Sequence, residues 1–174
     1  MGGVPAVEGV GSLTGSRITP SPLAAGDHCT TPTGVRMNFQ IDLDPTHRVL
    51  RTTIAAAVLT EKLLDDFYQE LSLVAYRGGP YAAIFDFSGV TDTTLSADAV
   101  RDFALRDPPI PGGRTRVAVA KEPLIFGFAR MVQQIRDLIG TQYQVVHSLE
   151  EAYNLVGVCP EDFSERIFPK DQAA

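Results

Sequence analysis

The stretch Ala82–Val100, AAIFDFSGVTDTTLSADAV, contains the transition that decides the fold. The apolar residues from Tyr81 to Phe87 are typical of a short strand that is buried on both faces of a parallel sheet. A turn rich in hydroxyl and carboxylate groups follows, and an amphipathic helical pattern resumes at Ser96. A buried strand that leads through a polar turn into a helix is the repeating unit of an α/β fold.

The alternation of strands and helices continues on both sides of this stretch. Upstream, alternating patterns at 37–43 and 49–55 flank the turn Asp44–His47 and predict a hairpin, which a helix at 60–76 follows. Downstream, the sequence predicts a helix at 96–105, a strand at 115–120, a helix at 124–139, a strand at 142–146 and a helix at 148–156. This order predicts an α/β fold with a mainly parallel, mixed sheet of about five strands and four helices.

The ends of the chain differ from the patterned middle. Residues 1–36 are rich in Gly, Pro, Ser and Thr and lack strand or helix periodicity, so we expect a disordered N-terminal extension. Residues 37–157 form the predicted domain, and residues 158–174 a C-terminal tail. A chain of 174 residues is long enough for one sizeable core.

Composition and charge restrict the class of function. The net charge of −6, without a cluster of Lys and Arg, argues against nucleic-acid binding. No apolar run approaches the length of a membrane span. Cys29 and Cys159 lie in the predicted tails, which favours a reducing compartment over a disulfide framework. We therefore expect a soluble cytoplasmic protein.

The polar turn of the opening stretch is the first candidate site. Ser96 precedes a helix, where a hydroxyl that accepts a backbone hydrogen bond contributes about 1 kcal/mol. A phosphate on Ser96 would meet the same N–H groups and the helix dipole, although Asp92 and Asp98 would repel it. The alternatives are a helix cap alone, or a phosphorylation or partner-binding site that also includes Asp92, Thr93 and Thr94.

The predicted helix at 124–139 carries the second candidate site. Gly127 inside it costs about 1 kcal/mol relative to alanine, so a close approach of a backbone or a ligand would explain it. Arg130 lies on the same helix face and is a candidate contact for a small anion. The alternative is helix packing or a homodimer through this helix, because exposed apolar residues often mark interfaces.

Nothing in the sequence indicates an enzyme, a cofactor or a metal site. The chain shows no nucleophile–base pair, and its histidines, His28, His47 and His147, lack metal-ligand spacing. Asp86 and Asp92 suit a structural role instead, as acceptors of backbone N–H groups in the turn. We therefore expect a protein without catalytic residues.

The segment Asp86–Thr91, DFSGVT, resembles the end of a strand in STAS domains, the fold of anti-sigma-factor antagonists. In that family an Asp-Ser-Ser-Gly loop follows, and Thr94–Ala97 occupies its positions here, with Ser96 at the position that the family phosphorylates. Three further segments are similar to SpoIIAA-like members: RVAVA from Arg116, FGFARM from Phe126 and VHSLEEA from Val146. The resemblance covers about residues 37–157.

This resemblance implies a superhelix of β-α units and a non-enzymatic regulatory or binding role. It implies a protein partner, anti-sigma-like or kinase-like, that engages the loop and helix start at residues 91–100. The alternative is a small-molecule or lipid-binding domain of the same fold. An apolar cavity between sheet and helices would favour the ligand, whereas a flat apolar patch would favour the protein partner.

Overall fold

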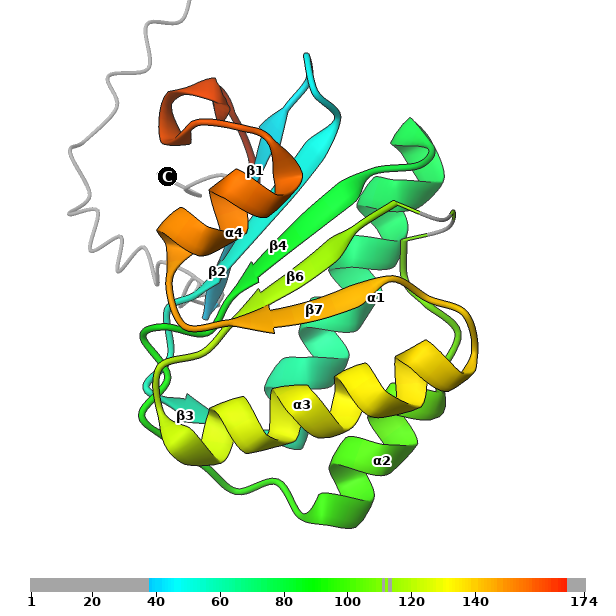
Figure 1. Cartoon of the computed structure of the whole chain (residues 1–174), viewed down its shortest axis with the longest axis vertical. Helices are drawn as coiled ribbons and strands as arrows, with labels where there is room; N and C mark the ends of the chain where they lie inside the picture. The colour runs from blue at the N-terminus through cyan, green and yellow to red at the C-terminus, as the bar shows by residue number, and fades with distance from the viewer. Residues whose placement is uncertain (1–37, 111, 113, 169–174) are drawn as a thin grey trace, which may run out of the picture. The chain divides into compact units, whose positions relative to one another are not determined.

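The structure is a computed structural model that describes residues 38–110, 112 and 114–168 (Figure 1). Its main sheet has the order β7-β6-β4-β2-β1-β8. The strands are β1 (Phe39–Asp44), β2 (Val49–Ile54), β4 (Ala82–Asp86), β6 (Arg116–Val119), β7 (Tyr143–Val146) and β8 (Glu165–Phe168). The short strands β3 (Val58–Leu59) and β5 (Asp92–Thr93) form a separate parallel pair. The helices are α1 (Glu61–Gly78), α2 (Ala97–Leu105), α3 (Pro123–Leu138) and α4 (Leu149–Val156), and η1 (Pro160–Asp162) is a 3-10 turn.

The sheet is mixed and its central pairs are parallel. Strands β2, β4, β6 and β7 run in the same direction, whereas β1 is antiparallel to both of its neighbours, β2 and β8. The α/β class and the mixed sheet predicted from the sequence are therefore confirmed. The main sheet in the described residues has six strands instead of about five, and the STAS-like superhelix stays a prediction.

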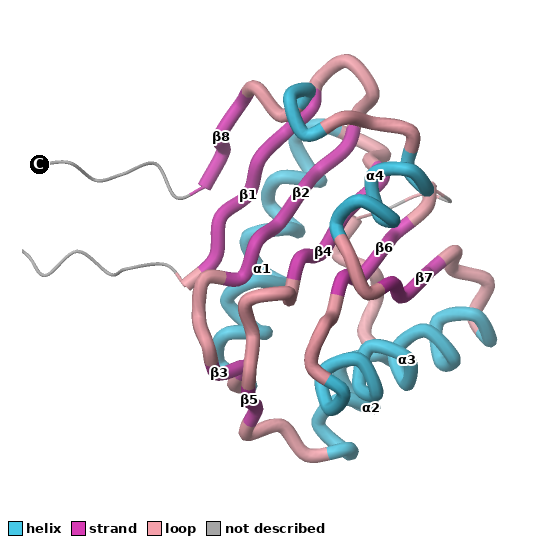
Figure 2. The backbone as a smooth tube through the Cα atoms, turned by 60° about the vertical axis from the view of Figure 1, so that its left-hand side comes forward, coloured by secondary structure: helices cyan, strands magenta, loops and turns pink. Residues whose placement is uncertain are grey.

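Strand β4 lies between two hydrophobic clusters, which explains its continuous apolar sequence. Ala83 and Phe85 belong to the larger cluster, together with residues of α1, α2 and α3. Ala82 and Ile84 point to the other face and belong to the smaller cluster, which α4 covers. Figures 1 and 2 show α4 on one side of the sheet and the other three helices on the opposite side. The predicted burial of this strand on both faces is confirmed.

Helix starts and ends follow the local signals in the sequence. Thr60, Ser96 and Ser148 each cap a helix with a side chain that accepts a backbone hydrogen bond, at the start of α1, α2 and α4 respectively. Helix α4 ends at Gly157, whose φ of 77° lies in the left-handed region that favours glycine. The four α-helices therefore begin close to the predicted positions.

The segment after Gly157, for which the sequence predicts only a tail, contains η1 and β8. Val158 is buried in the smaller cluster, and β8 pairs antiparallel with β1 (Figure 2). The predicted N-terminal extension, residues 1–36, lies outside the described residues. Among the helices that the structure describes, none combines the length and the apolar character needed to cross a membrane.

Candidate functional site

An apolar pocket lies between the sheet and the helices α2 and α3. Aromatic side chains from four elements line it, namely Phe67 of α1, Phe85 of β4, Phe103 of α2 and Tyr143 of β7. Pro108 and Pro109, in the loop that follows α2, complete this part of the wall. The enclosed volume is about 40 Å³. A cavity needs roughly 10–15 Å³ to hold a water molecule, so this one has room for a small chemical group.

A second cavity of about 50 Å³ adjoins the first. Four side chains line both cavities: Phe87, Phe103, Val132 and Tyr143. From this common wall the second cavity extends between Leu59 and Phe128, and its lining is apolar apart from the Tyr143 hydroxyl. A rotation of one shared aromatic side chain would join the two cavities into one elongated apolar space.

Two buried arginines line the first cavity. Arg116 is the first residue of β6, and Arg136 lies in the last turn of α3. Their exposed fractions are only 5% and 4%. Arginine is almost never buried to this extent unless an anionic group pairs with it. The pair is therefore the most unusual chemical feature of the pocket.

The hydrogen-bond partners of both arginines are backbone carbonyls. Arg116 Nη2 donates to the carbonyl oxygens of Ile110, at 2.5 Å, and Gly112, at 3.0 Å. Arg136 Nη1 donates to the carbonyl oxygen of Arg106 at 2.7 Å. The buried Nε of Arg116 has no partner among the described residues. Within the same residues, neither guanidinium forms an ion pair with a carboxylate.

Burial and like charge act together on the two guanidiniums. Burial lowers the pKa of Arg116, and the neighbouring charge of Arg136 lowers it further, against the opposing effect of Tyr143. Burial also lowers the pKa of Arg136, and Tyr143, Tyr68 and Asp107 oppose this shift. Arginine side chains nevertheless stay protonated in proteins, so two positive charges are buried beside the cavity.

Tyr143 lines the same cavity and carries a neutral hydroxyl. Burial raises its pKa above the ordinary value of 10.0, although Arg136 and Arg116 both act to lower it. Thr141 also lines this cavity. The side chains that line the two cavities include no histidine, cysteine or carboxylate. The surfaces of the two cavities are almost wholly apolar, so the arrangement can surround an apolar body.

The first site predicted from the sequence lies outside this pocket. The Ser96 Oγ accepts a hydrogen bond from the Ala99 N–H at 3.1 Å, so the predicted helix cap is confirmed. Ser96 also borders a depression of about 300 Å³ between α1 and α2. Four acidic residues line this depression: Glu61, Asp65, Asp98 and Asp102. These carboxylates would repel a phosphate on Ser96, and a role in phosphorylation or partner binding stays a prediction.

The neighbouring polar residues stabilise the turn between β4 and α2. Thr93 Oγ1 donates to the carbonyl oxygen of Leu59 at 2.9 Å and accepts from the Leu95 N–H at 3.0 Å. Asp92 Oδ1 accepts from the Thr93 N–H at 2.7 Å, and Asp86 makes the corresponding bond to the Ser88 N–H at 2.9 Å. The predicted structural role of both aspartates is confirmed. Thr94 is exposed.

The second predicted site lies on the exposed side of α3. Arg130 is exposed and donates to Gln133 Oε1 at 2.5 Å on the same helix. No atom from elsewhere in the described chain lies within 4 Å of the place where a Cβ of Gly127 would stand. Packing within the described chain therefore does not explain this glycine, and an anion contact at Arg130 stays a prediction.

The sequence contains a signal that Arg116 and Arg136 are unusual, although periodicity alone does not reveal it. The buried face of α3 comprises Ile125, Ala129, Val132 and Arg136, so a charged residue occupies a position of the apolar stripe. Arg116 likewise opens a strand whose four residues are all buried. A charge at a core position is the feature that could have identified both arginines from the sequence.

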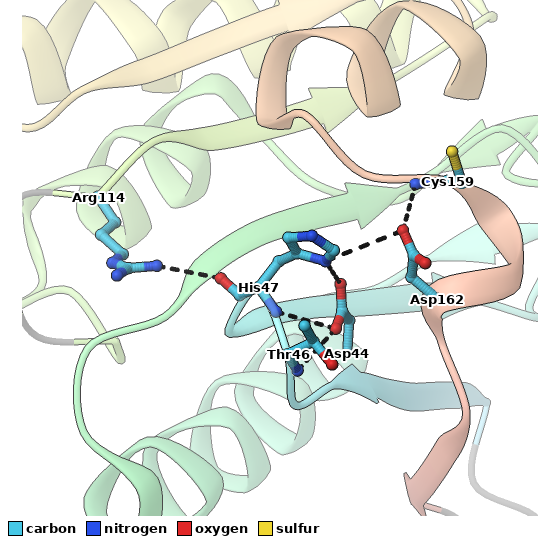
Figure 3. Close-up of polar contacts among 6 residues, drawn as sticks. All are labelled: Asp44, Thr46, His47, Arg114, Cys159 and Asp162. Carbon is cyan, nitrogen blue, oxygen red and sulfur yellow. Dashed lines mark hydrogen bonds and ion pairs between the residues drawn. The ribbon is translucent and has the colours of Figure 1, made fainter.

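A cluster of candidate metal ligands lies at the β1–β2 turn (Figure 3). Asp44 Oδ1 accepts hydrogen bonds from the N–H groups of Thr46 and His47, and its Oδ2 lies 2.6 Å from His47 Nδ1. Asp162 of η1 places Oδ2 at 3.9 Å from the same nitrogen. Burial raises the pKa of Asp44, but the hydrogen bonds and charge of His47, together with the Thr46 N–H, outweigh it and lower the pKa overall.

These three residues could hold a cation, because their ligand atoms lie within 4.8 Å of one another. The spacing in the sequence hides the cluster, since Asp162 comes from a distant segment. The hydrogen bonds of Asp44 also have a purely structural explanation, because an aspartate at this position commonly stabilises a turn.

Comparison with protein-family models, curated proteins and solved structures finds no significant match for this chain. The function must therefore be inferred from the geometry of the site. Membership of the STAS-like family remains a prediction.

Proposed function

We propose that this protein is a non-enzymatic binding domain whose small-molecule ligand occupies the apolar space between the sheet and helices α2 and α3. The observation that carries the proposal is the pair of adjoining cavities, of about 40 and 50 Å³, with shared aromatic walls. A concave apolar site with a few convergent polar groups is the usual form of a ligand pocket. A flat apolar patch would have favoured a protein partner instead.

Helix α2 is the element best placed to admit a ligand. It packs chiefly against α3 and is joined to the rest of the domain by the turn before Ser96 and the proline-containing loop after Leu105. Phe103 of α2 lines both cavities, so an outward shift of this helix would enlarge both together. A ligand that is too large for the two cavities can therefore enter when α2 moves outward.

Binding of a neutral apolar fluorophore tests this proposal directly. N-phenyl-1-naphthylamine should bind the full chain and fluoresce more strongly, and Val132→Phe should abolish the signal because Val132 lines both cavities. Gln134→Phe is the matched control, since Gln134 is exposed on the same helix. If Val132→Phe does not fold, Phe103→Ala should increase binding by enlarging the pocket. Absence of binding to the wild type, or an unchanged signal in the folded pocket variants, would contradict the proposal.

A partner-binding module that uses residues 91–100 is the second candidate function. The observation in its favour is the acidic depression of about 300 Å³ beside Ser96, which fits a basic segment of a partner. Its one lining arginine, Arg106, already pairs with Asp65 at 2.5 Å. Capture of a basic protein by the wild type, but not by an Asp98→Lys/Asp102→Lys variant, would support this function. Equal capture by both would contradict it. A homodimer through α3 likewise stays a prediction.

A further inference from the structure

We propose that the ligand of this pocket presents a neutral aromatic hydrocarbon ring to the two cavities, with no hydrogen-bonding atom on its buried part. This inference rests on the proposed function, because it names the chemical class of the molecule that occupies the same site. Three features of the pocket carry it: an apolar cavity surface, arginine N–H groups that bind a loop instead of facing the cavity, and a wall rich in aromatic side chains.

The cavity surfaces exclude polar ligand groups. The surface of the first cavity is apolar, and that of the second is almost wholly so. A hydroxyl or amide that moves from water into such a site loses its hydration and gains no hydrogen bond in return, which is strongly unfavourable. The buried part of the ligand therefore carries no hydrogen-bond donor or acceptor.

The two buried arginines exclude charged ligand groups. Arg116 Nη2 donates to the carbonyl oxygens of Ile110 and Gly112, and Arg136 Nη1 donates to that of Arg106. Because the cavity surface beside them is apolar, the aliphatic stems of these arginines face the cavity and their N–H groups do not. An anion would find no donor there, and both positive charges would repel a cation. The buried part of the ligand is therefore uncharged.

The aromatic wall favours a ring over a saturated chain. Six aromatic side chains line one or both cavities: Phe67, Phe85, Phe87, Phe103, Phe128 and Tyr143. The rings of Phe67 and Phe85 are nearly perpendicular, with an interplanar angle of 89°, so a ligand ring that is parallel to one is perpendicular to the other. Offset-stacked and edge-to-face contacts both stabilise aromatic pairs beyond the effect of buried area. An aromatic ligand gains these contacts and a saturated one does not.

The volumes of the cavities limit the ligand to a small ring system. An apolar protein cavity of about 150 Å³ binds benzene. The two cavities, of about 40 and 50 Å³, are smaller than this even together. A ring therefore binds when α2 moves outward and the cavities join along their shared wall at Phe87 and Phe103.

An alkyl chain is the competing ligand, because the second cavity also has aliphatic side chains in its lining. These are Leu59, Leu64, Leu95, Val100, Ile125, Ala129 and Val132. The two ligand classes differ in one measurable respect. A pocket for an alkyl chain ranks ligands by their hydrophobicity alone, whereas an aromatic site binds rings more tightly than their hydrophobicity predicts.

Displacement of N-phenyl-1-naphthylamine from the full chain by toluene, methylcyclohexane and phenol, which are similar in size, measures this difference. Each affinity is divided by the partition coefficient of the compound between hexadecane and water, which removes the contribution of hydrophobicity. Toluene should then exceed methylcyclohexane by about threefold or more, because of its contacts with the aromatic wall. Phenol should not exceed toluene by more than about tenfold, because a cavity without a hydrogen-bond partner solvates its hydroxyl as poorly as hexadecane does.

Variants of the wall locate the effect. Phe87→Leu replaces a ring that lines both cavities by an aliphatic side chain, and should reduce the preference for toluene over methylcyclohexane. Tyr76→Leu is the matched control, since Tyr76 is 91% exposed, and should leave the preference unchanged. Tyr143→Phe should leave the corrected affinity for phenol unchanged, because the inference assigns no hydrogen bond to the Tyr143 hydroxyl.

The outcomes separate this inference from the proposed function. A corrected preference for toluene below about threefold would overturn the aromatic assignment and leave a pocket for an alkyl chain in place. A larger excess of phenol over toluene than about tenfold would reveal a hydrogen-bond partner and overturn the exclusion of polar groups. Failure of the fluorophore to bind the wild type would overturn the proposed function itself. If Phe87→Leu does not fold, the ligand series on the wild type still decides the question.

Discussion

Replacement of Arg136 by methionine tests whether this buried charge stabilises the fold. Arg136 is 4% exposed, and the hydrogen bond that it donates to the Arg106 carbonyl would be lost. Loss of a hydrogen bond to a charged group costs about 1.5–3 kcal/mol. Removal of this buried charge beside Arg116 stabilises the folded state by several kcal/mol, because the desolvation penalty and the like-charge repulsion both disappear. Well-packed apolar replacements of buried ions are neutral or stabilising by about 1–4 kcal/mol.

We therefore expect Arg136→Met to raise the free energy of unfolding of the ligand-free protein by about 0–2 kcal/mol. Urea denaturation at neutral pH, with a two-state fit, measures this change. The double variant with Arg116→Met should gain less than the sum of the single variants, because the repulsion can be relieved only once. A loss of more than about 3 kcal/mol in Arg136→Met would refute the reasoning, because it would show that the arginine is needed to hold the loop after α2.

Three further predictions address the rest of the domain. Ser96→Ala should lower the free energy of unfolding by about 1 kcal/mol. Ser96→Asp should retain most of the stabilisation from the cap, because aspartate also caps helices. Equal losses of stability in the two variants, measured by urea denaturation, would contradict this prediction. The pKa of Asp44 is lowered from 3.8, so its stabilising effect is present above that pH and is lost as the pH falls further. Asp44→Asn should therefore destabilise the protein at neutral pH and differ less from the wild type near pH 3, and a pH-independent difference would rule out this linkage. Ile84→Ala should cost about 2–5 kcal/mol, because the side chain is fully buried, whereas Leu138→Ala, at an 87% exposed residue, should cost less than about 0.5 kcal/mol; similar losses in the two variants would contradict the assigned core.

Local signals explain the parts of the fold that the sequence predicts correctly. The caps at Thr60 and Ser96 depend on a hydroxyl and on N–H groups within the next three residues, so neighbouring residues alone specify them. Strand β4 is predictable because burial on both faces requires a continuous apolar run. The hairpin at Asp44 is predictable for a similar reason, since turn residues separate two alternating strands.

Pairing between distant segments explains what the sequence does not predict. Strands β3 and β5 have two residues each, and strand β8 has four, so they are too short to show a period. Their pairing partners come from other parts of the chain, which a single sequence does not reveal. The pocket cannot be predicted for the same reason, because Arg116 of β6 and Arg136 of α3 line it together only when α3 packs on the sheet.

A crystal structure of the full chain with N-phenyl-1-naphthylamine would test the central claim most directly. The proposed function predicts the fluorophore against Phe87 and Phe103, which line both cavities, with α2 displaced outward as far as the ligand requires. A fluorophore bound only at the exposed surface, or an unfilled pocket at a saturating concentration of the fluorophore, would contradict the claim.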